Sequence, residues 1–269
     1  MDIQSAQRYT RQTLAPYCTD DSDYLLAYSL GKDRAWLYAH SEYRLGSKQI
    51  SRLKQLIERR NDGKPLAYLK GQQEFYGLNF YVNEAVLIPR PETEVAVAYA
   101  IDWLPQGGRL LDLGSGCGNI AIAIAYHRPD LHIVASDVSL QALDIARKNM
   151  QLHRCNITLK HSDWYQNIDE HFDWIISNPP YIAAGDVDAD DREISAEPEL
   201  ALYAEDNGCA ALKAVIAGAR NHLKRQATLL IEHSPKQATI TAQLMQSAGF
   251  TSAHCLKDIA SLQRYTIGR

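Results

Sequence analysis

The chain has 269 residues, 46% of them hydrophobic, and a formal net charge of −4 at pH 7, which suits a globular protein near the size at which one core divides into two. It holds no run of 18 apolar residues and begins without the basic and apolar regions of a secretory signal, so we expect no membrane span and no membrane partner. Its five cysteines form no Cys-x-x-Cys pair, which predicts reduced thiols and a cytoplasmic protein.

Residues 1–71 are predicted to form a domain of short helices. Residues that can act as N-caps mark three helix starts, at Asp20 to Ser22, at Asp33 and at Ser47. The third helix has an apolar stripe and a set of basic residues that we interpret as a solvated face: Lys48, Arg52, Lys54, Arg59 and Arg60. This domain carries +4 and the rest of the chain −8, which counts against a nucleic-acid substrate.

Residues 72–88 are predicted to form a hairpin that links two domains, with alternating strand-like residues and a turn at Asn83-Glu84. Pro89-Arg90-Pro91 then predicts a stiff extended segment, and a helix is expected from Glu92 or Thr93 onward. Glu94 fits the acid favoured at a helix N-terminus, whereas for Glu92 a paired-carboxylate role stays open.

A glycine-rich turn follows the apolar strand expected at 109–113. It reads Gly114-Ser115-Gly116-Cys117-Gly118 and leads into a helix expected at 118–126. Asn119 stands where a dinucleotide-binding fold has its third glycine, and no Walker lysine follows, so a nicotinamide site is disfavoured and a P-loop is excluded. Cys117 is interpreted as a small loop residue rather than a nucleophile.

The next expected strand, 131–136, ends at Asp137. An acid at this place can accept hydrogen bonds from both ribose hydroxyls of a bound nucleoside. The glycine loop and this acid together predict a pocket for a nucleoside without a pyrophosphate, which points to S-adenosylmethionine (SAM).

Strands and helices alternate from residue 107 onward, which predicts an α/β domain with a mostly parallel sheet. After Asp137 we expect a helix, two strands, a helix, a strand, a helix and a closing antiparallel hairpin, at 139–150, 157–160, 172–177, 207–223, 227–232, 235–248, and 251–256 with 262–268. These elements add up to a seven-stranded sheet.

Asn178-Pro179-Pro180-Tyr181 follows the apolar strand 172–177. The prolines cannot extend the strand, so the chain must turn out at the sheet edge where ligands bind in open α/β folds. Asn178 and a proline carbonyl can accept the two protons of a planar amino group, and Tyr181 can stack on its plane. The alternative is an ordinary proline-rich turn with a structural asparagine.

The polar segment 182–200 predicts a lid over the substrate. Asp186, Asp188, Asp190 and Glu197 fall at positions 1, 3, 5 and 12 of an EF-hand count. The glycine that such a loop needs at position 6 is replaced by Asp191, so we expect no calcium and no other metal site.

The sequence resembles the class I SAM-dependent methyltransferases and, more closely, the peptide chain release factor N5-glutamine methyltransferases. Four stretches carry the resemblance, in the same order as in the family: Glu74-Phe75-Tyr76-Gly77-Leu78, Leu87-Ile88-Pro89-Arg90-Pro91-Glu92-Thr93-Glu94, the glycine loop 112–118, and Ser177-Asn178-Pro179-Pro180-Tyr181. The loop alone is typical of any SAM enzyme, whereas the Ile-Pro-Arg-Pro-Glu-Thr-Glu run is specific to this family.

The resemblance implies a Rossmann-like class I methyltransferase domain at 89–269 and an N-terminal helical domain at 1–71 that docks a protein substrate. It implies that 89–94 line the pocket and that Asp163 and Trp164 flank the adenine of SAM, although a core role for Trp164 is equally open. It also matches an acid and a histidine at Glu232-His233, and we assign His233 no catalytic role.

The implied reaction is methyl transfer to the side-chain nitrogen of a glutamine, most specifically in the Gly-Gly-Gln loop of peptide chain release factors, with no direct nucleic-acid partner. Asn178 Oδ1 and the Pro179 carbonyl would each accept one amide proton. Two alternatives stay open: an adenine N6 methyltransferase acting on DNA or RNA, which would use the same residues on a flipped base, and a non-catalytic SAM-binding partner. A monomer is the default expectation.

Overall fold

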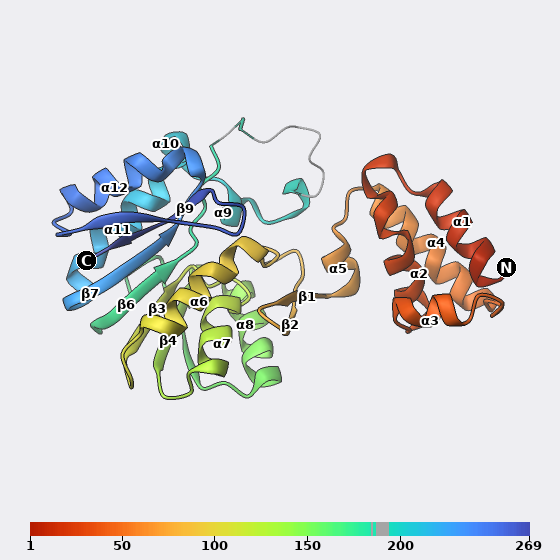
Figure 1. Ribbon diagram of the computed structural model, residues 1–269, viewed down its shortest axis with the longest axis horizontal. Helices are drawn as coiled ribbons and strands as arrows, with labels where there is room; N and C mark the ends of the chain where they lie inside the picture. Colours follow the sequence, from red (N-terminus) through yellow and green to blue (C-terminus); the bar gives the residue numbers. More distant parts are fainter. Residues whose placement is uncertain (184, 187–193) are drawn as a thin grey trace. The chain divides into compact units, whose positions relative to one another are not determined.

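A computed structural model describes residues 1–183, 185–186 and 194–269 (Figure 1). These residues form two compact units. The first holds Met1–Gly71 and, of the later residues described, 194–196; the second holds the remainder from Gln72 to Arg269. Residues 184 and 187–193 of the expected lid lie outside the described residues, and with them Asp188, Asp190 and Asp191 of the EF-hand count.

The first unit is helical, as its sequence predicts. Its elements are α1 (Ile3–Thr13), η1 (Pro16–Asp21), α2 (Ser22–Leu30), α3 (Arg34–Ala39), α4 (Ser47–Asn61) and α5 (Leu66–Lys70). Gly31 ends α2 in the left-handed region, and Asp33 caps α3 by accepting the Trp36 N–H. The apolar stripe of α4 is buried, with Leu53 and Ile57 in the core of this unit.

Two details of α4 differ from expectation. Its N-cap is Gly46, whose N–H donates to the Gln49 side chain at 2.9 Å, and Ser47 is already helical. Arg60 is buried and pairs with Asp21 at 2.6 Å, so it does not belong to a solvated face. The pairing of Arg60 depends on Asp21, a partner 39 positions away, which the periodicity of α4 cannot report.

The hairpin is present, but its turn lies elsewhere. Strands β1 (Gln72–Phe75) and β2 (Leu78–Tyr81) pair antiparallel around Tyr76-Gly77, whose φ values of 51° and 73° suit a tight two-residue turn. The turn expected at Asn83-Glu84 follows the hairpin instead, where the Asn83 side chain accepts the Ala85 N–H. A tyrosine at a positive φ is uncommon, which is why the sequence did not reveal this turn.

The second unit contains a seven-stranded sheet in the order β5-β4-β3-β6-β7-β9-β8. The strands are β3 (Arg109–Leu113), β4 (His132–Asp137), β5 (Ile157–His161), β6 (Phe172–Ser177), β7 (Leu223–Glu232), β8 (Ala253–Lys257) and β9 (Gln263–Gly268). All pairs are parallel except those of β9. Leu113 is in register with both Ser136 and Ser177, so the carboxyl ends of β3, β4 and β6 are level.

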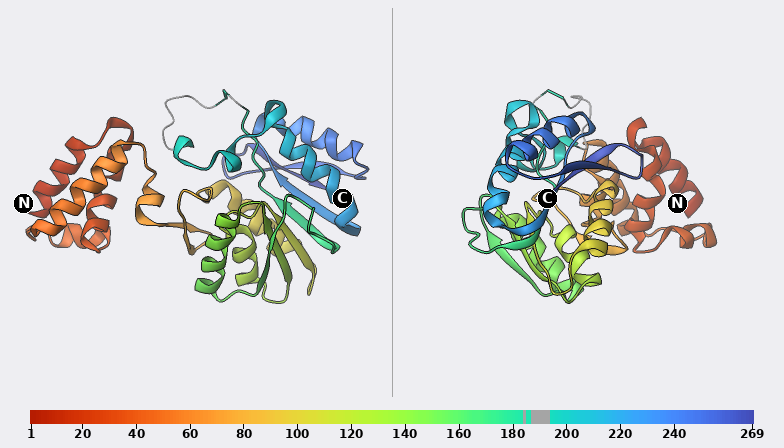
Figure 2. Two further views of the ribbon diagram at one scale, coloured as in Figure 1. Left: turned by 180° about the vertical axis from the view of Figure 1, so that it is seen from behind. Right: turned by 60° about the vertical axis from the view of Figure 1, so that its left-hand side comes forward.

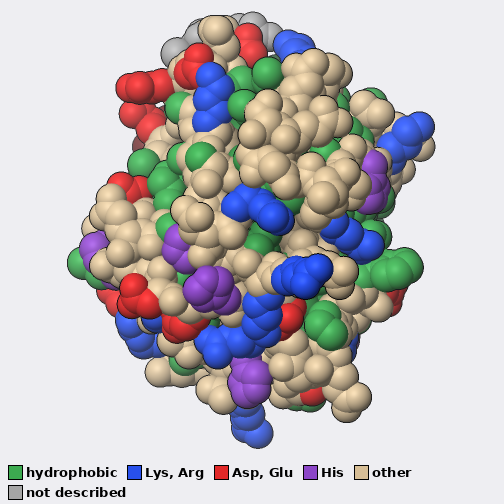
Figure 3. Space-filling view, turned by 90° about the vertical axis from the view of Figure 1, so that its left-hand side faces the viewer, with side chains coloured by type: hydrophobic (Ala, Val, Ile, Leu, Met, Phe, Trp, Pro, Cys, Tyr) green, Lys and Arg blue, Asp and Glu red, His purple; other side chains and the backbone are tan. Residues whose placement is uncertain are grey.

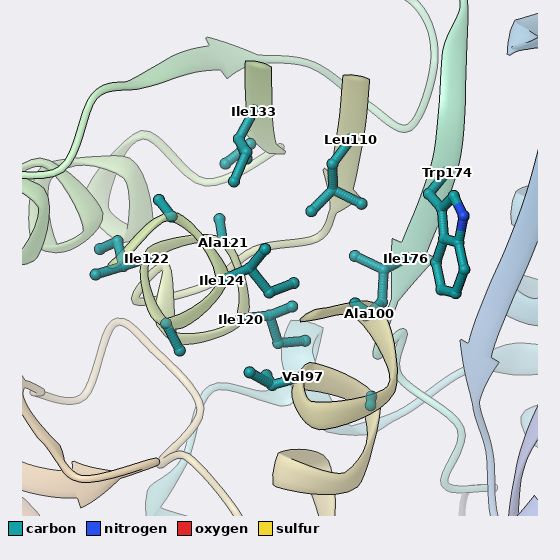
Figure 4. Packing of buried hydrophobic residues seen from close by; sticks show 14 of the residues in the cluster. Val97, Ala100, Leu110, Ile120, Ala121, Ile122, Ile124, Ile133, Trp174 and Ile176 are labelled. Atoms are coloured by element: carbon teal, nitrogen blue, oxygen red, sulfur yellow. The ribbon is translucent and has the colours of Figure 1, made fainter. Parts of the chain in front are cut away.

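Helices cover both faces of this sheet (Figures 1 and 2). On one face lie α6 (Glu94–Trp103), α7 (Asn119–His127) and α8 (Leu140–His153); on the other lie α11 (Ala210–His222) and α12 (Ala238–Ser247). Successive strand residues point to opposite faces, so Leu110 joins the first core and Leu111 the second. Figure 4 shows Val97, Ile120 and Ile124 packed beneath the strands of the first core.

The short elements are η2 (Pro91–Thr93), η3 (Ile194–Ala196), α9 (Glu199–Leu202), α10 (Glu205–Gly208) and η4 (Pro235–Gln237). The helix expected from residue 207 begins only at Ala210, because Asp206, Asn207 and Gly208 have φ values of 57°, 52° and 79°. Those three residues form a left-handed turn that no right-handed helix can include. Among the described residues, none of the helices combines the length and apolar character that a membrane span requires.

Candidate functional site at the carboxyl edge of the sheet

A cavity of about 350 Å³ lies in the second unit at the carboxyl ends of β3, β4 and β6. Its volume falls in the range of pockets that hold small molecules and cofactors. Residues from several loops line it: Ala85, Val86, Leu87, Gly114, Gly116, Asp137, Val138, Ser139, Ala142, Ser162, Asp163, Trp164, Asn178, Pro180, Pro198, Leu200 and Ala201. The level strand ends therefore bring the glycine loop, the acid after β4 and the Asn-Pro-Pro-Tyr motif to one place.

The glycine loop contributes Gly114 and Gly116 to this cavity. The N–H groups of Gly114 and Ser115 both donate to the Ser136 carbonyl, at 2.9 and 3.0 Å, which ties the loop to β4. A Cβ on Gly114 would stand 3.9 Å from the Trp164 ring, in the space between loop and indole. The missing side chain at Gly114 therefore leaves that space free for a ligand.

The other three predicted loop residues do not line the cavity. Ser115 and Cys117 are buried, and burial raises the pKa of the Cys117 thiol to about 12, which keeps it protonated and rules out a thiolate nucleophile. Gly118 faces α8, where a Cβ would stand 3.2 Å from that of Ala146. Gly118 thus allows helix packing rather than ligand contact.

Asp137 ends β4 and is held by two backbone donors. Its Oδ2 accepts the Gly116 N–H and its Oδ1 accepts the Ser139 N–H, each at 2.8 Å. Burial is the main cause that raises the pKa of Asp137, and these N–H groups oppose it. A carboxylate has about four acceptor positions, so this side chain can still accept hydrogen bonds from a ligand in the cavity.

Asp163 and Trp164 both line the cavity. Trp164 has a φ of 45°, and its carbonyl accepts a hydrogen bond from the Ser162 hydroxyl at 2.8 Å. The same indole packs against the core formed by β6, β7 and α11. Trp164 therefore lines the cavity and also packs against the core.

The Asn-Pro-Pro-Tyr motif leaves β6 at this edge, with Asn178 and Pro180 in the cavity wall and Pro179 buried. Tyr181 does not line this cavity, and burial raises the pKa of its phenol to about 12. The Tyr181 carbonyl accepts from Gln237 Nε2 at 3.1 Å, and Ile182 pairs with Tyr203 just beyond. Tertiary contacts hold the motif on both sides.

The run that begins at Pro89 is placed differently from expectation. Residues 85–87, just before this run, line the cavity, whereas none of residues 89–94 is among its lining residues. Arg90 pairs there with the buried carboxylate of Glu197, which also accepts the Ile88 N–H at 2.9 Å. Thr93 reaches Asn178 from behind the cavity, a contact that sequence reasoning missed because the two residues are 85 positions apart.

Glu94 is engaged through its side-chain carboxylate, whereas the contact found for Glu92 is made by its backbone carbonyl. Glu94 Oε1 accepts the Tyr76 N–H at 2.9 Å and so holds the hairpin turn, while the Glu92 carbonyl accepts from the Tyr265 hydroxyl. His233 is fully buried between the Thr266 hydroxyl and the Ser234 carbonyl, at 2.8 Å from each, in accord with a structural role.

Comparison with known proteins identifies the family. Residues 4–71 match the model of the PrmC N-terminal domain, and residues 95–195 match that of the methyltransferase small domain. The release factor glutamine methyltransferase of Xylella fastidiosa (strain Temecula1) is 38% identical over 253 residues, which cover 93% of this chain and 92% of that protein. This chain belongs to the release factor glutamine methyltransferase family.

Other relatives agree with this assignment. The release factor glutamine methyltransferase of Escherichia coli (strain K12) is also 38% identical, over 93% of this chain and 91% of its own. Among solved structures, a methyltransferase from Pyrococcus furiosus is 17% identical with a TM-score of 0.56, and it covers 72% of this chain and 89% of that one. The solved structure supports the fold, which is of the class I methyltransferase type.

Release factor glutamine methyltransferases use SAM as the methyl donor, and the cavity fits such a molecule. Gly114 leaves space beside an indole, Gly116 also lines the cavity, and a carboxylate with spare acceptor positions lies at the end of the neighbouring strand. Those are the groups that a nucleoside with two free hydroxyls needs.

Proposed function

We propose that this protein transfers a methyl group from SAM to the side-chain amide nitrogen of a glutamine in peptide chain release factors. Relatives that carry this name match nearly the whole chain, including the N-terminal unit. The observation that carries the chemistry is the position of Asn178. Its side chain lines the same cavity as the glycine loop and Asp137, so an amide group bound there would lie next to the methyl donor.

In this proposal Gly114, Gly116 and Asp137 hold the nucleoside part of SAM, with Asp163 and Trp164 beside its adenine. The sulfonium of SAM supplies an electrophilic methyl group. The new bond joins the glutamine nitrogen to that methyl carbon, the carbon–sulfur bond breaks, and the nitrogen then releases one proton to water. Ser115, Cys117 and Gly118 shape the loop rather than contact the ligand.

The chain's own contribution is to position a weak nucleophile. An amide nitrogen reacts poorly because its lone pair is delocalised into the carbonyl. Asn178 Oδ1 and the Pro179 carbonyl would each accept one amide proton, while Pro180 and Tyr181 restrict the plane of the group. Orientation of this kind can lower a barrier by roughly 7–11 kcal/mol, so no side-chain base is needed to start the reaction.

The test is transfer of labelled methyl from SAM to purified release factors, with and without their loop glutamine. We expect label that depends on this glutamine, and we expect Asn178→Ala to abolish turnover while SAM still binds in calorimetry. Label on DNA or RNA instead would favour the adenine N6 alternative, and SAM binding without any transfer would favour a non-catalytic partner. Near-normal turnover of Asn178→Ala would contradict the role of this side chain.

Charge distribution favours the protein substrate over nucleic acid. Residues 72–269 carry a formal charge of −8, against +4 in residues 1–71. On the face shown in Figure 3, Lys and Arg side chains lie both near the middle and at the rim, with Asp and Glu side chains among them, so this face is mixed in sign. A DNA-binding surface would instead present a continuous basic field.

We further propose that the N-terminal unit docks the protein substrate through α4. Arg52 and Arg59 are exposed on this helix and border a hollow with Tyr28, Gln55 and Glu58. The Arg52 guanidinium lies 4.9 Å from the centre of the Tyr28 ring, which holds its charge at the rim of the hollow.

Charge reversal tests this docking role. Arg52→Glu and Arg59→Glu should raise the KM for the release factor and leave SAM affinity unchanged. Lys54→Glu is the matched control, because Lys54 is exposed on the same helix but does not border the hollow. An equal effect of all three variants would show general electrostatics rather than docking at this hollow.

A further inference from the structure

Behind the cavity, a chain of hydrogen bonds joins three side chains from separate parts of the sequence. The Thr93 hydroxyl donates to Glu232 Oε2 at 2.8 Å, and Asn178 Nδ2 donates to Thr93 Oγ1 at 3.4 Å. Thr93 comes from η2, Asn178 follows β6 and Glu232 ends β7. Thr93 and Glu232 are 1% and 2% exposed, so water does not compete for the hydrogen bond between them.

The direction of these hydrogen bonds determines which way the Asn178 amide faces. A hydroxyl has one proton, and an ionised carboxylate can only accept. When Thr93 gives its proton to Glu232, its oxygen can only accept from Asn178, so the amide must turn its N–H₂ toward Thr93. Asn178 Oδ1 is then the amide atom that remains for a ligand in the cavity.

We propose that Glu232, acting through Thr93, is a positioning residue that holds the Asn178 amide in the orientation that accepts a substrate N–H. This inference rests on the proposed function of Asn178. Without the carboxylate, the Thr93 proton could go to Asn178 Oδ1, and the amide would present donors to a substrate amide that also offers donors. Two facing sets of N–H groups repel, so the substrate would lose its alignment.

The surroundings of Glu232 make this orientation sensitive to pH. Burial is the largest cause that raises the pKa of Glu232 to about 7, and the charge of Glu92 acts in the same direction. The Thr93 hydroxyl, the Arg264 guanidinium and the Tyr265 hydroxyl oppose the shift, and the Tyr181 phenol faces the same carboxylate. The carboxylate form, which orients Asn178, therefore becomes the main form only above neutral pH.

Three variants test the proposal. Thr93→Val removes the hydroxyl at nearly constant shape, Thr93→Ser keeps it, and Glu232→Gln replaces one of the two carboxylate oxygens by an N–H₂ group that can only donate. We expect Thr93→Val and Glu232→Gln to lower kcat for release factor methylation by about tenfold or more, which is the effect of losing one aligned hydrogen bond. Thr93→Ser should stay within about threefold of the wild type, and all three should bind SAM within about threefold of it.

The pH profile separates positioning from simple structural support. The kcat of the wild type should rise with pH through the neutral range as Glu232 loses its proton, and Glu232→Gln should lose this rise. Thermal melts before the assay identify any variant that fails to fold. Normal kcat in folded Thr93→Val, or a Glu232→Gln profile with the wild-type rise, would overturn the proposal.

These assays distinguish a failure of the proposed function from a failure of the positioning role. If the wild type does not methylate release factors, the proposed function fails. If the wild type is active and Asn178→Ala is inactive while Thr93→Val is normal, only the positioning role of Glu232 and Thr93 fails.

Discussion

The contact between Gly208 and Tyr181 predicts that Gly208→Ala is strongly destabilising. Gly208 is the last residue of the left-handed turn in α10, with a φ of 79°. A Cβ built on it would stand 2.4 Å from the Tyr181 carbonyl oxygen and 3.0 Å from Gln237 Nε2. The neighbouring atom is backbone, so the substitution must displace the motif that carries Asn178.

The expected loss of stability in Gly208→Ala has two parts. A non-glycine residue in the left-handed region costs about 1–2 kcal/mol. Crowding by the added Cβ in a packed interior costs about 1–3 kcal/mol more, and it strains the hydrogen bond from Gln237 Nε2 to the Tyr181 carbonyl. We therefore expect Gly208→Ala to lower the free energy of unfolding by about 2–5 kcal/mol.

Gly249→Ala is the matched control. Gly249 has a φ of 87°, and its added Cβ would meet no atom of the described residues within 4 Å. Gly249→Ala should lower the free energy of unfolding by only about 1–2 kcal/mol, the cost of backbone strain. Urea unfolding of both variants gives the difference, and methyl transfer under folding conditions should fall in Gly208→Ala alone. Equal losses of stability in the two variants would refute the reasoning.

Three further predictions concern buried groups. Burial raises the pKa of Asp112 to about 7, so the folded state binds this proton more tightly than the unfolded state does. The free energy of unfolding should therefore fall as pH rises from about 4 to about 7, by up to about 4 kcal/mol. Asp112→Asn should reduce this fall in unfolding curves measured across that range; an unchanged pH dependence would argue against it. Glu197→Ala should lower the free energy of unfolding by about 3 kcal/mol, because it leaves the Arg90 guanidinium and the buried Ile88 N–H without their acceptor. Arg147→Ala, at an exposed ion pair, should lower it by under about 0.5 kcal/mol in the same assay. Cys117→Ser should retain methyl transfer, and Cys117 in the native protein should resist thiol reagents until unfolding, since its thiol is buried and protonated; rapid native labelling would contradict this.

The sequence was most informative where local pattern and tertiary structure agree. The alternating strands and helices from residue 107 onward predicted the seven-stranded sheet, because strands buried on both faces read as apolar runs such as Leu110–Leu113. The glycine spacing and Asp137 predicted the cavity at the carboxyl edge, since adjacent parallel strands end at a common level.

Local errors arose where a rare backbone conformation was needed. Tyr76 adopts a positive φ that tyrosine seldom shows, and Asp206, Asn207 and Gly208 adopt positive φ values in succession, so the hairpin turn and the start of α11 were misplaced. The N-cap of α4 was misplaced by one residue. The cap is Gly46, whose N–H donates to the Gln49 side chain, and Ser47 is the first helical residue.

By itself the sequence determined the elements, their order and the residues that meet at the sheet edge. It could not show which of those residues face the cavity, or that Thr93, Asn178 and Glu232 form one chain of hydrogen bonds. Thr93 and Glu232 are 139 positions apart, and only the pairing of β6 with β7 and the return of η2 bring them together. The direction of each hydrogen bond, and thus the orientation of the Asn178 amide, is a property of that buried arrangement and of no residue alone.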